Sequence, residues 1–353
     1  MTQRALMMLT GAAAAMMLAT AAFAQPAVER SVKVEPGGLY EIVFNPADSD
    51  VYVAAVGPRG ADAAAVARLD GATLEAEGLF GVAATPLYGL ALNAATQTLY
   101  GTDTRSGHVV AISVATGETV AEITSDREGA HIRQVAVDEA NNRIYVSEVA
   151  GRGDAPIPSR IWIIDGADNT LERVIDVAGT LTGLAVDVAN DRAFSTDMVS
   201  NEVVVVDLAS GQTTHRWPVG SENTINVAHD AAGERLFVTA QGTGDLTVMN
   251  ASDGSVIHKV ATGEGALSVA WDAPRDRIYV ANRRAGTVSV IDGTSYEILA
   301  NLETGTFPQT IAVNPADGAV YVTNKARGLP RGAPAGTPVP VDPTGDVVTL
   351  IRP

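Results

Sequence analysis

Cationic side chains are the residues of this chain whose types and spacing are best suited to chemistry. Most of them follow short aliphatic-aromatic segments, in stretches that break an otherwise regular pattern. The set that we assign to a candidate ligand site is Arg59, Arg105, His131, Arg133, Arg283, Arg284, Lys325 and Arg327. Converging guanidinium and ammonium groups bind carboxylates and phosphates. These residues predict a site for an anionic small molecule, a single-stranded nucleic acid or a partner protein, unless they are ordinary solvated loop charges.

Groups that could catalyse a reaction are few. Five histidines lie at positions 108, 131, 215, 229 and 258, without the close spacing typical of metal sites. No nucleophile elbow, phosphate-binding loop or dinucleotide fingerprint occurs. The absence of cysteine excludes disulfides, thiolate zinc sites, thioether-linked haem and a thiol nucleophile. We therefore expect a binding protein with no catalytic residues, no metal and no cofactor.

The elements that would position the cations are shown by a repeated aromatic residue. It recurs every 42 to 49 residues, at Tyr52, Tyr100, Tyr145, Phe194, Phe237, Tyr279 and Tyr321. A repeat of this length without helical periodicity is typical of propeller blades. One unit contains four strand-like segments, which we expect at Ala266–Trp271, Arg277–Ala281, Thr287–Asp292 and Ile298–Glu303. The sequence predicts an all-β, seven-bladed β-propeller of four-stranded antiparallel blades.

The last repeat lacks its fourth strand. Segments at Thr310–Asn314, Ala319–Asn324 and Asp346–Ile351 supply three strands before the chain ends at Pro353. We expect the N-terminal segment Ser31–Glu35 to complete this blade and close the ring, because an unpaired edge would otherwise remain. Residues 25–353 would then form a single domain.

The loops on one face of such a ring, here called the top face, carry the candidate site. They join the second strand of each blade to the third, and the fourth strand to the next blade. Two of them are long, at residues 150–160 and 325–346, and are either binding segments or connections without a role. The starts of the inner strands should place a polar ring around the axis, formed by Tyr88, Arg133, Thr182, Asn226, Ser268 and Gln309.

Residues 1–24 have the features of a secretory signal peptide. Arg4 precedes an apolar stretch that ends in Ala22-Phe23-Ala24. We expect cleavage before Gln25 and a mature protein in the periplasm, monomeric and without stable membrane insertion. The net charge of −17 argues against long-range attraction to nucleic acid or to an anionic membrane.

The segments Ile-Tyr-Val-Ala-Asn at 278–282 and Val-Tyr-Val-Thr-Asn at 320–324, each followed by a Val-rich strand, carry a family resemblance. The chain resembles the YVTN-repeat β-propeller family, and in particular its periplasmic YncE-like members. The resemblance implies an exported seven-bladed propeller without established enzymatic activity, with single-stranded DNA binding in the YncE type. Aromatic residues make up only 5% of this chain, which disfavours an extended base-stacking platform.

An enzyme is the alternative. The architecture is similar to that of seven-bladed lactonases and streptogramin lyases, which hold a metal at the top of the channel. Under this hypothesis a divalent metal would be bound near His131, with Glu148, Glu222 and Glu264 as the candidate acids.

Overall fold

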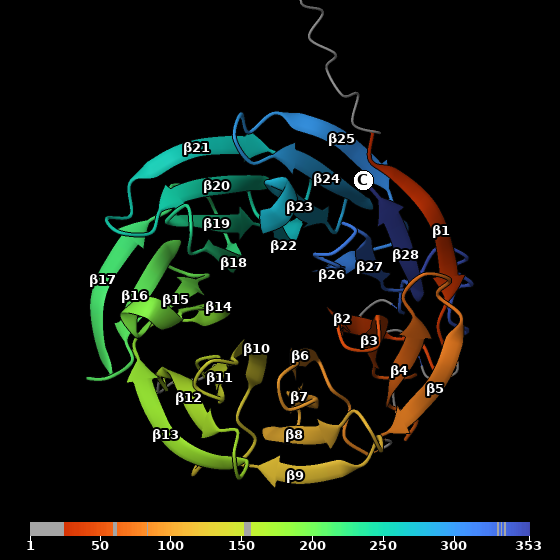
Figure 1. Ribbon diagram of the computed structural model, residues 1–353, viewed down its shortest axis with the longest axis horizontal. Helices are drawn as coiled ribbons and strands as arrows, with labels where there is room; N and C mark the ends of the chain where they lie inside the picture. Colours follow the sequence, from red (N-terminus) through yellow and green to blue (C-terminus); the bar gives the residue numbers. More distant parts are fainter. Residues whose placement is uncertain are drawn as a thin grey trace, which may run out of the picture.

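Four-stranded antiparallel sheets are arranged radially around a central axis in the computed structural model of the chain (Figure 1). The structure describes residues 25–58, 62–82, 84–151, 157–329, 332, 334 and 337–353. Within these residues there are seven sheets and almost no helix, so the protein is a seven-bladed β-propeller. The predicted fold class is confirmed.

Each blade runs from an inner strand beside the axis to an outer strand at the rim, and blades are numbered along the chain from the one that begins with β2. The inner strands are β2 (Leu39–Phe44), β6 (Gly89–Asn93), β10 (Ile132–Asp138), β14 (Leu181–Asp187), β18 (Thr224–Asp230), β22 (Ala266–Asp272) and β26 (Pro308–Val313). The second strands are β3 (Asp50–Ala55), β7 (Thr98–Asp103), β11 (Arg143–Glu148), β15 (Arg192–Asp197), β19 (Arg235–Ala240), β23 (Arg277–Asn282) and β27 (Val320–Asn324).

The third strands are β4 (Ala65–Asp70), β8 (His108–Ser113), β12 (Ser159–Asp165), β16 (Glu202–Asp207), β20 (Asp245–Asn250), β24 (Thr287–Asp292) and β28 (Val347–Arg352). The outer strands are β5 (Ala76–Gly81), β9 (Thr119–Ile123), β13 (Thr170–Val177), β17 (Gln212–Pro218), β21 (Val256–Ala261), β25 (Ile298–Glu303) and β1 (Ala27–Lys33). Two short 3-10 turns, η1 (Val188–Asn190) and η2 (Ala273–Arg275), follow β14 and β22. The strands predicted for the sixth repeat agree with β22 to β25 to within one residue at each end.

The repeated aromatic residue lies in the second strand of every blade and is buried. Tyr52 of blade one packs with Leu87, Leu90 and Leu99 of blade two. The series ends with Tyr321 of blade seven, which packs against blade one, so that every aromatic fills the interface with the following blade. A single four-stranded sheet cannot bury both of its faces, and stacking around a ring solves this for all seven at once.

The N-terminal strand closes the ring, as predicted, but with different bounds. β1 pairs antiparallel with β28 and becomes the outer strand of blade seven (Figure 1). The prediction placed this strand at residues 31–35, whereas β1 spans Ala27–Lys33 and its register pairs Ala27 with Arg352. β1 begins earlier because β28 extends to Arg352, whose guanidinium pairs with Glu29 at 2.8 Å.

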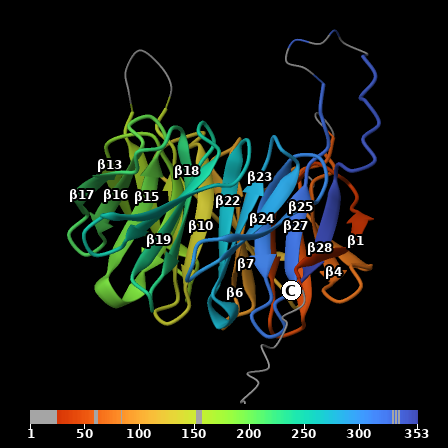
Figure 2. The same ribbon diagram turned by 90° about the horizontal axis from the view of Figure 1, so that it is seen from above.

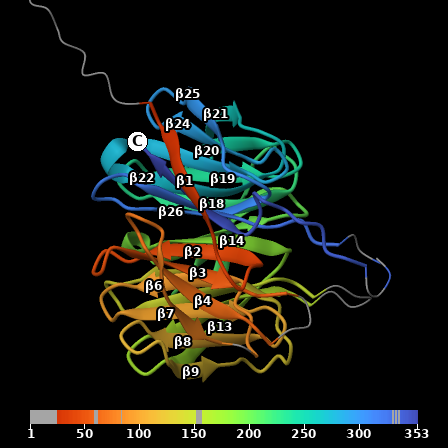
Figure 3. The ribbon, with the colours of Figure 1, turned by 90° about the vertical axis from the view of Figure 1, so that its right-hand side faces the viewer.

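The described ends of the Pro-rich segment between β27 and β28, residues 325–329 and 337–346, lie on the top face of the ring, the upper side in Figure 2 and the right-hand side in Figure 3. Its base is fixed by hydrogen bonds. Asp342 accepts from the backbone N–H of Arg327 at 3.1 Å and from the hydroxyl of Thr306 at 2.9 Å. Lys33 donates to the carbonyl of Gly345 at 2.6 Å, which joins the segment to the closing strand.

Candidate ligand site at the channel mouth

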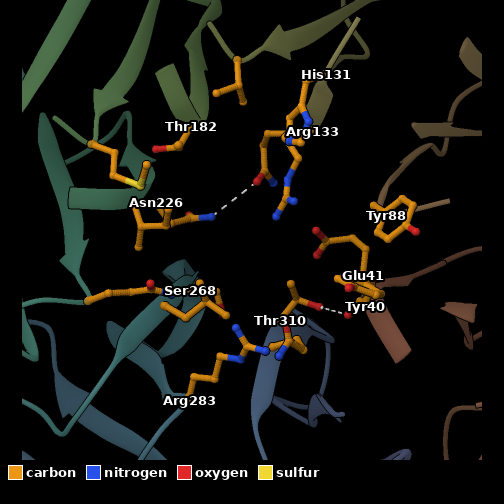
Figure 4. A pocket seen from close by; sticks show the side chains of 17 residues that line it. Tyr40, Glu41, Tyr88, His131, Arg133, Thr182, Asn226, Ser268, Arg283 and Thr310 are labelled. Atoms are coloured by element: carbon orange, nitrogen blue, oxygen red, sulfur yellow. Dashed lines mark hydrogen bonds between the residues drawn. The ribbon is translucent and has the colours of Figure 1, made fainter. Parts of the chain in front are cut away.

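A cavity of about 350 Å³ lies on the axis at the top of the channel (Figure 4). Inner strands, with the residues just before β6 and β10, contribute most of its wall, and the first residues after several second strands contribute the rest. The residues that line it are Tyr40, Glu41, Tyr88, His131, Arg133, Gln134, Val149, Thr182, Met198, Ile225, Asn226, Gln241, Leu267, Ser268, Arg283, Gln309 and Thr310.

Two rings of residues form this part of the wall, and all of them lie in the inner strands except Tyr88, which directly precedes β6. The upper ring contains Tyr40, Tyr88, Arg133, Thr182, Ile225, Leu267 and Gln309. The next residue of each strand belongs to the lower ring, which contains Glu41, Gly89, Gln134, Gly183, Asn226, Ser268 and Thr310. All of these except the two glycines line the cavity.

A β-bulge explains why consecutive residues reach the channel. In six inner strands the pairing with the second strand shifts register at the two ring positions, as between Leu39 and Ile42 in β2. In a regular strand neighbouring side chains point to opposite faces. A bulge sets two residues against one on the partner strand and changes their direction, so each bulged strand gives the channel two side chains.

Hydroxyl groups hold the ring residues from behind. Thr102 of β7 accepts the backbone N–H of Gly89 at 2.9 Å and donates to the carbonyl of Arg133 in the next blade at 2.8 Å. Thr323 of β27 makes the equivalent bond to the carbonyl of Tyr40 at 2.6 Å, across the junction between the last blade and the first. The backbone of the site is therefore positioned by bonds between blades.

Two arginines enter the cavity from different blades. Arg133 comes from the upper ring of blade three, and Arg283 follows β23 in blade six (Figure 4). Burial lowers the pKa of Arg283, and the positive charge of Arg133 lowers it further. The Arg283 Nε is shielded from solvent and has no hydrogen-bond partner among the described residues. Shielded cations with unused donors are suited to an anionic ligand.

Glu41 is the one carboxylate that lines the cavity within the described residues. Burial raises its pKa to about 7, although the hydroxyl of Thr310, the backbone N–H of Ile42 and the charge of Arg133 all act to lower it. It forms no salt bridge with any described residue. At neutral pH the group is therefore close to half-protonated.

Cations lie over aromatic rings around the mouth. The guanidinium of Arg105 is 5.6 Å from the ring centre of Tyr88, and the ammonium of Lys325 is 3.7 Å from that of Tyr40. Lys325 also donates a hydrogen bond to the Tyr40 hydroxyl. Phe307 lies between two arginines, with Arg283 at 5.1 Å and Arg327 at 5.7 Å from its ring centre. Such contacts restrain long cationic side chains while leaving them charged.

The structure places the predicted cations in three settings. His131, Arg133 and Arg283 line the cavity, whereas Arg105, Lys325 and Arg327 lie at its rim. Arg284 is directed away and pairs with Glu264 at 3.6 Å, with both side chains exposed. Arg59 lies outside the described residues.

All six residues of the predicted polar ring line the cavity, but they do not form one ring. Tyr88, Arg133, Thr182 and Gln309 belong to the upper ring, whereas Asn226 and Ser268 belong to the lower one. The prediction merged the two layers because a strand read with a period of two offers only one inward residue at this point.

Sequence reasoning missed Tyr40 and Glu41, which blade one contributes. A usable signal was present, since Leu-Tyr-Glu-Ile-Val-Phe-Asn-Pro at 39–46 aligns with Pro-Gln-Thr-Ile-Ala-Val-Asn-Pro at 308–315. Also missed was an apolar part of the wall, formed by Val149, Met198, Ile225 and Leu267. Their aliphatic types had no feature that separated them from core residues.

The acids considered for an enzyme do not converge on His131. Glu148 is buried and accepts hydrogen bonds from Arg127 and from the indole of Trp162, the latter at 2.8 Å. Glu222 and Glu264 are exposed and do not line the cavity. Of the residues considered for the enzyme alternative, only His131 lines the cavity, because Glu148 is engaged with Arg127 and Trp162 and the other two acids face solvent.

A search of the described residues for side chains that could share a metal ion finds Asp50, Asp70 and Glu77. They lie in blade one, where Asp50 begins β3 at the end of the blade opposite to the cavity. Arg68 already joins two of them, at 2.6 Å from Asp50 and 3.2 Å from Glu77. This group reads as an ion-pair network of the blade.

Comparison with known proteins places these features in a family. A family model described as YNCE-like beta-propeller matches residues 155–330. YncE from Salmonella typhi is 30% identical over 259 residues, which cover 69% of this chain and 71% of that protein. The chain belongs to the YncE-like β-propeller family. YncE from Escherichia coli K12 is 29% identical over 262 residues, covering 70% of this chain and 72% of YncE. Both YncE proteins are described as uncharacterized.

The YncE-like fold is also similar to solved propellers of low sequence identity. The β-propeller domain of Cps50 (Swd1) from Myceliophteria thermophila superposes with a TM-score of 0.69 at 10% identity, covering 93% of this chain and 99% of that domain. This likeness concerns the fold alone. In the described part of this YncE-like chain, no helix has the length and apolar character needed to cross a membrane.

Proposed function

We propose that this protein is a non-enzymatic binding propeller that takes an anionic ligand into the cavity at the channel mouth. The observation that carries the proposal is the approach of Arg133 and Arg283 to one recessed cavity from blades three and six. A recess limits the water that screens the charges, so a carboxylate or phosphate gains more there than on an open surface.

Neighbouring arginines provide the test and its control. Arg283 lines the cavity, whereas Arg284 lies outside it in an exposed pair with Glu264. Citrate and inorganic phosphate would be titrated by calorimetry into the wild type, into a variant carrying Arg133→Gln and Arg283→Gln, and into Arg284→Gln. We expect the double variant to bind about tenfold more weakly or worse, and Arg284→Gln to bind like the wild type. Equal binding by all three proteins would contradict the proposal.

Single-stranded nucleic acid is a second candidate, favoured by the alternation of cations and aromatic rings at the rim. Tyr40, Tyr88 and Phe307 each lie beside a cation there. Stacking of bases on such rings gives sequence-tolerant binding. Fluorescence anisotropy with an oligothymidylate of about 15 nucleotides would test this candidate. Nucleic-acid binding at the rim predicts weaker binding by Tyr88→Ala and a steep loss of affinity as the salt concentration rises. A Tyr88→Ala protein that binds the oligonucleotide like the wild type would count against this candidate.

A lactonase-like or streptogramin-lyase-like hydrolase or lyase is the remaining alternative. If a divalent metal were bound at the channel mouth, Glu41 and His131 would offer it a carboxylate and an imidazole from the cavity wall. Elemental analysis of protein purified without chelator distinguishes the alternatives. One equivalent of metal that is lost in Glu41→Gln would support the enzyme, because the binding propeller needs none.

We also propose that the protein is exported to the periplasm and acts there as a monomer. The support is the signal-like sequence of residues 1–24, which lie outside the described residues. Mass spectrometry of the periplasmic fraction should find a chain that begins at Gln25, and size-exclusion chromatography with light scattering should give the mass of one chain. A full-length chain confined to the cytoplasm would rule out export.

A further inference from the structure

The carboxylate of Glu41 lies inside the proposed anion site, where a negative charge is unexpected. Glu41 lies in the lower ring of blade one and reaches the same space as Arg133 and Arg283 (Figure 4). Its negative charge would repel an anion, and its burial disfavours the charged form. A site that takes only anions would bind them better with a neutral residue at this position.

The positions of the charges separate two kinds of subsite. Arg133 belongs to blade three and Arg283 to blade six, while Glu41 belongs to blade one between them on the ring (Figure 1). Glu41 forms no salt bridge within the described residues, so neither Arg133 nor Arg283 is paired with it directly. One ligand can therefore meet an acceptor for a cation and donors for an anion in the same cavity.

The rest of the wall adds an apolar surface. Val149, Met198, Ile225 and Leu267 come from four consecutive blades, the third to the sixth. Blades four and five lie across the axis from blade one, so Met198 and Ile225 face the side that carries Glu41 (Figure 1). Mixed lining of this kind binds organic molecules through apolar contact and orients them with a few polar groups.

We propose that the ligand of this cavity is a small zwitterion with an apolar substituent, namely an apolar α-amino acid. Its ammonium group would lie against Glu41, its carboxylate against Arg133 and Arg283, and its substituent on Met198 and Ile225. The cavity of about 350 Å³ limits the ligand to this size. This inference rests on the proposed function, which it narrows from an anion to a molecule with both charges.

Three related probes test the pairing of charges. Leucine carries both charges, N-acetyl-leucine lacks the ammonium group, and leucinamide lacks the carboxylate. Calorimetry on the full chain at pH 7 should detect leucine, or methionine or phenylalanine if the apolar wall prefers them. We expect either blocked form of the bound amino acid to lose about tenfold or more in affinity.

Variants then assign each charge to its residue. Glu41→Gln should lower the affinity for the amino acid about tenfold. Its affinity for the N-acetyl form should stay the same or rise. The double variant of Arg133 and Arg283 should lose both ligands. The enthalpy of amino acid binding should also depend on the buffer, because an ammonium beside Glu41 favours its ionised form and releases a proton. The Arg284→Gln protein is the control for each titration.

The outcomes separate this inference from the proposed function. Binding of N-acetyl-leucine that equals or exceeds that of leucine, with no loss in Glu41→Gln, would overturn the zwitterion and leave the anion site. The zwitterion would also be overturned if leucine, methionine and phenylalanine all failed to bind up to about 10 mM while citrate still bound through the two arginines. If no probe depends on Arg133 and Arg283, both proposals are wrong.

Discussion

At the scale of single residues, Glu41 is a group of the site whose charged form is disfavoured by burial. It is half-buried beside the axis with its pKa raised to about 7 by burial, well above the ordinary value of 4.5. A residue that costs stability in its charged form and lies in a cavity is a candidate for a role in binding. Arg283, with a shielded and unpaired Nε, is a second such residue.

The raised pKa of Glu41 predicts how stability changes with pH. Between pH 4.5 and about 7 the folded protein keeps a proton that the unfolded chain has lost. The contribution of Glu41 to the free energy of unfolding is therefore fully present below pH 4.5 and falls as the pH rises to 7 and above. Glu41→Gln should be more stable than the wild type at pH 8, by about 1–3 kcal/mol, and similar to it at pH 4.

Thermal unfolding of both proteins from pH 4 to pH 8 would measure this difference. Contributions from groups that do not interact with Glu41 cancel when the two curves are subtracted. A difference that stays constant with pH would show that the Glu41 carboxyl titrates as it does in water.

At the scale of elements, the bulge of the inner strand is the device that builds the site. It delivers a pair of neighbouring residues. In four blades a hydroxyl from the second strand of the preceding blade also holds the carbonyl of the first residue, at Tyr40, Arg133, Thr182 and Leu267. The sequence alone could not reveal this layer, because a bulge is a property of pairing between two strands and changes no residue type. For that reason the polar ring was predicted with the right residues but merged into one level.

Thr102→Val tests the hydroxyl. The substitution keeps the shape of the side chain but leaves the N–H of Gly89 without its 2.9 Å bond and the carbonyl of Arg133 without its 2.8 Å bond. We expect a loss of about 1–3 kcal/mol in the free energy of unfolding, because Thr102 is fully buried. Binding of citrate should weaken as well, since Arg133 loses its support.

Thr98→Val, at the other end of β7, is the matched control. Thr98 is partly exposed and its hydroxyl contacts only the neighbouring turn at Thr96. Denaturant unfolding of the two variants should give a large change for Thr102 and a small one for Thr98. Similar losses in both would mean that the hydroxyl bridge between blades contributes no more than an ordinary surface contact.

At the scale of the whole molecule, the repeat determines almost everything that could be predicted. A period of 42 to 49 residues, set by aromatic residues that fill the blade interfaces, was sufficient for the number of blades and for ring closure. The bounds of β1 could not be predicted in the same way, because residues 28–35 largely alternate between apolar and polar types and their pattern does not fix the register with β28. Tyr40 and Glu41 were missed in the sequence because the first repeat follows the closing strand closely, which makes the start of its inner strand hard to locate.

The junction between the chain ends predicts the effect of a covalent lock. Ser31 of β1 is opposite Thr349 of β28, and their hydroxyl oxygens are 2.8 Å apart. The chain has no cysteine, so Ser31→Cys with Thr349→Cys can form only the intended disulfide within one molecule. We expect the oxidised protein to gain about 2–4 kcal/mol in the free energy of unfolding.

Differential scanning calorimetry with and without reductant would measure the gain, and the single Ser31→Cys protein controls for the substitution itself. The rise in Tm should disappear on reduction. If a disulfide confirmed by mass spectrometry leaves Tm unchanged, unfolding does not begin at the junction of β1 and β28.

The two rings also have an evolutionary consequence. Their backbone is held by hydroxyls and strand pairing, and none of their side chains is part of a hydrophobic core between blades. Gly89 and Gly183 are exceptions in another sense, because a side chain there would collide with the backbone of the next blade. Substitution at the other ring positions can therefore alter what the protein recognises while leaving its foldability nearly intact. A combinatorial library confined to the ring positions other than Gly89 and Gly183 would sample new specificities on one scaffold. The same freedom would let duplicated genes of this architecture diverge in ligand long before they diverge in shape.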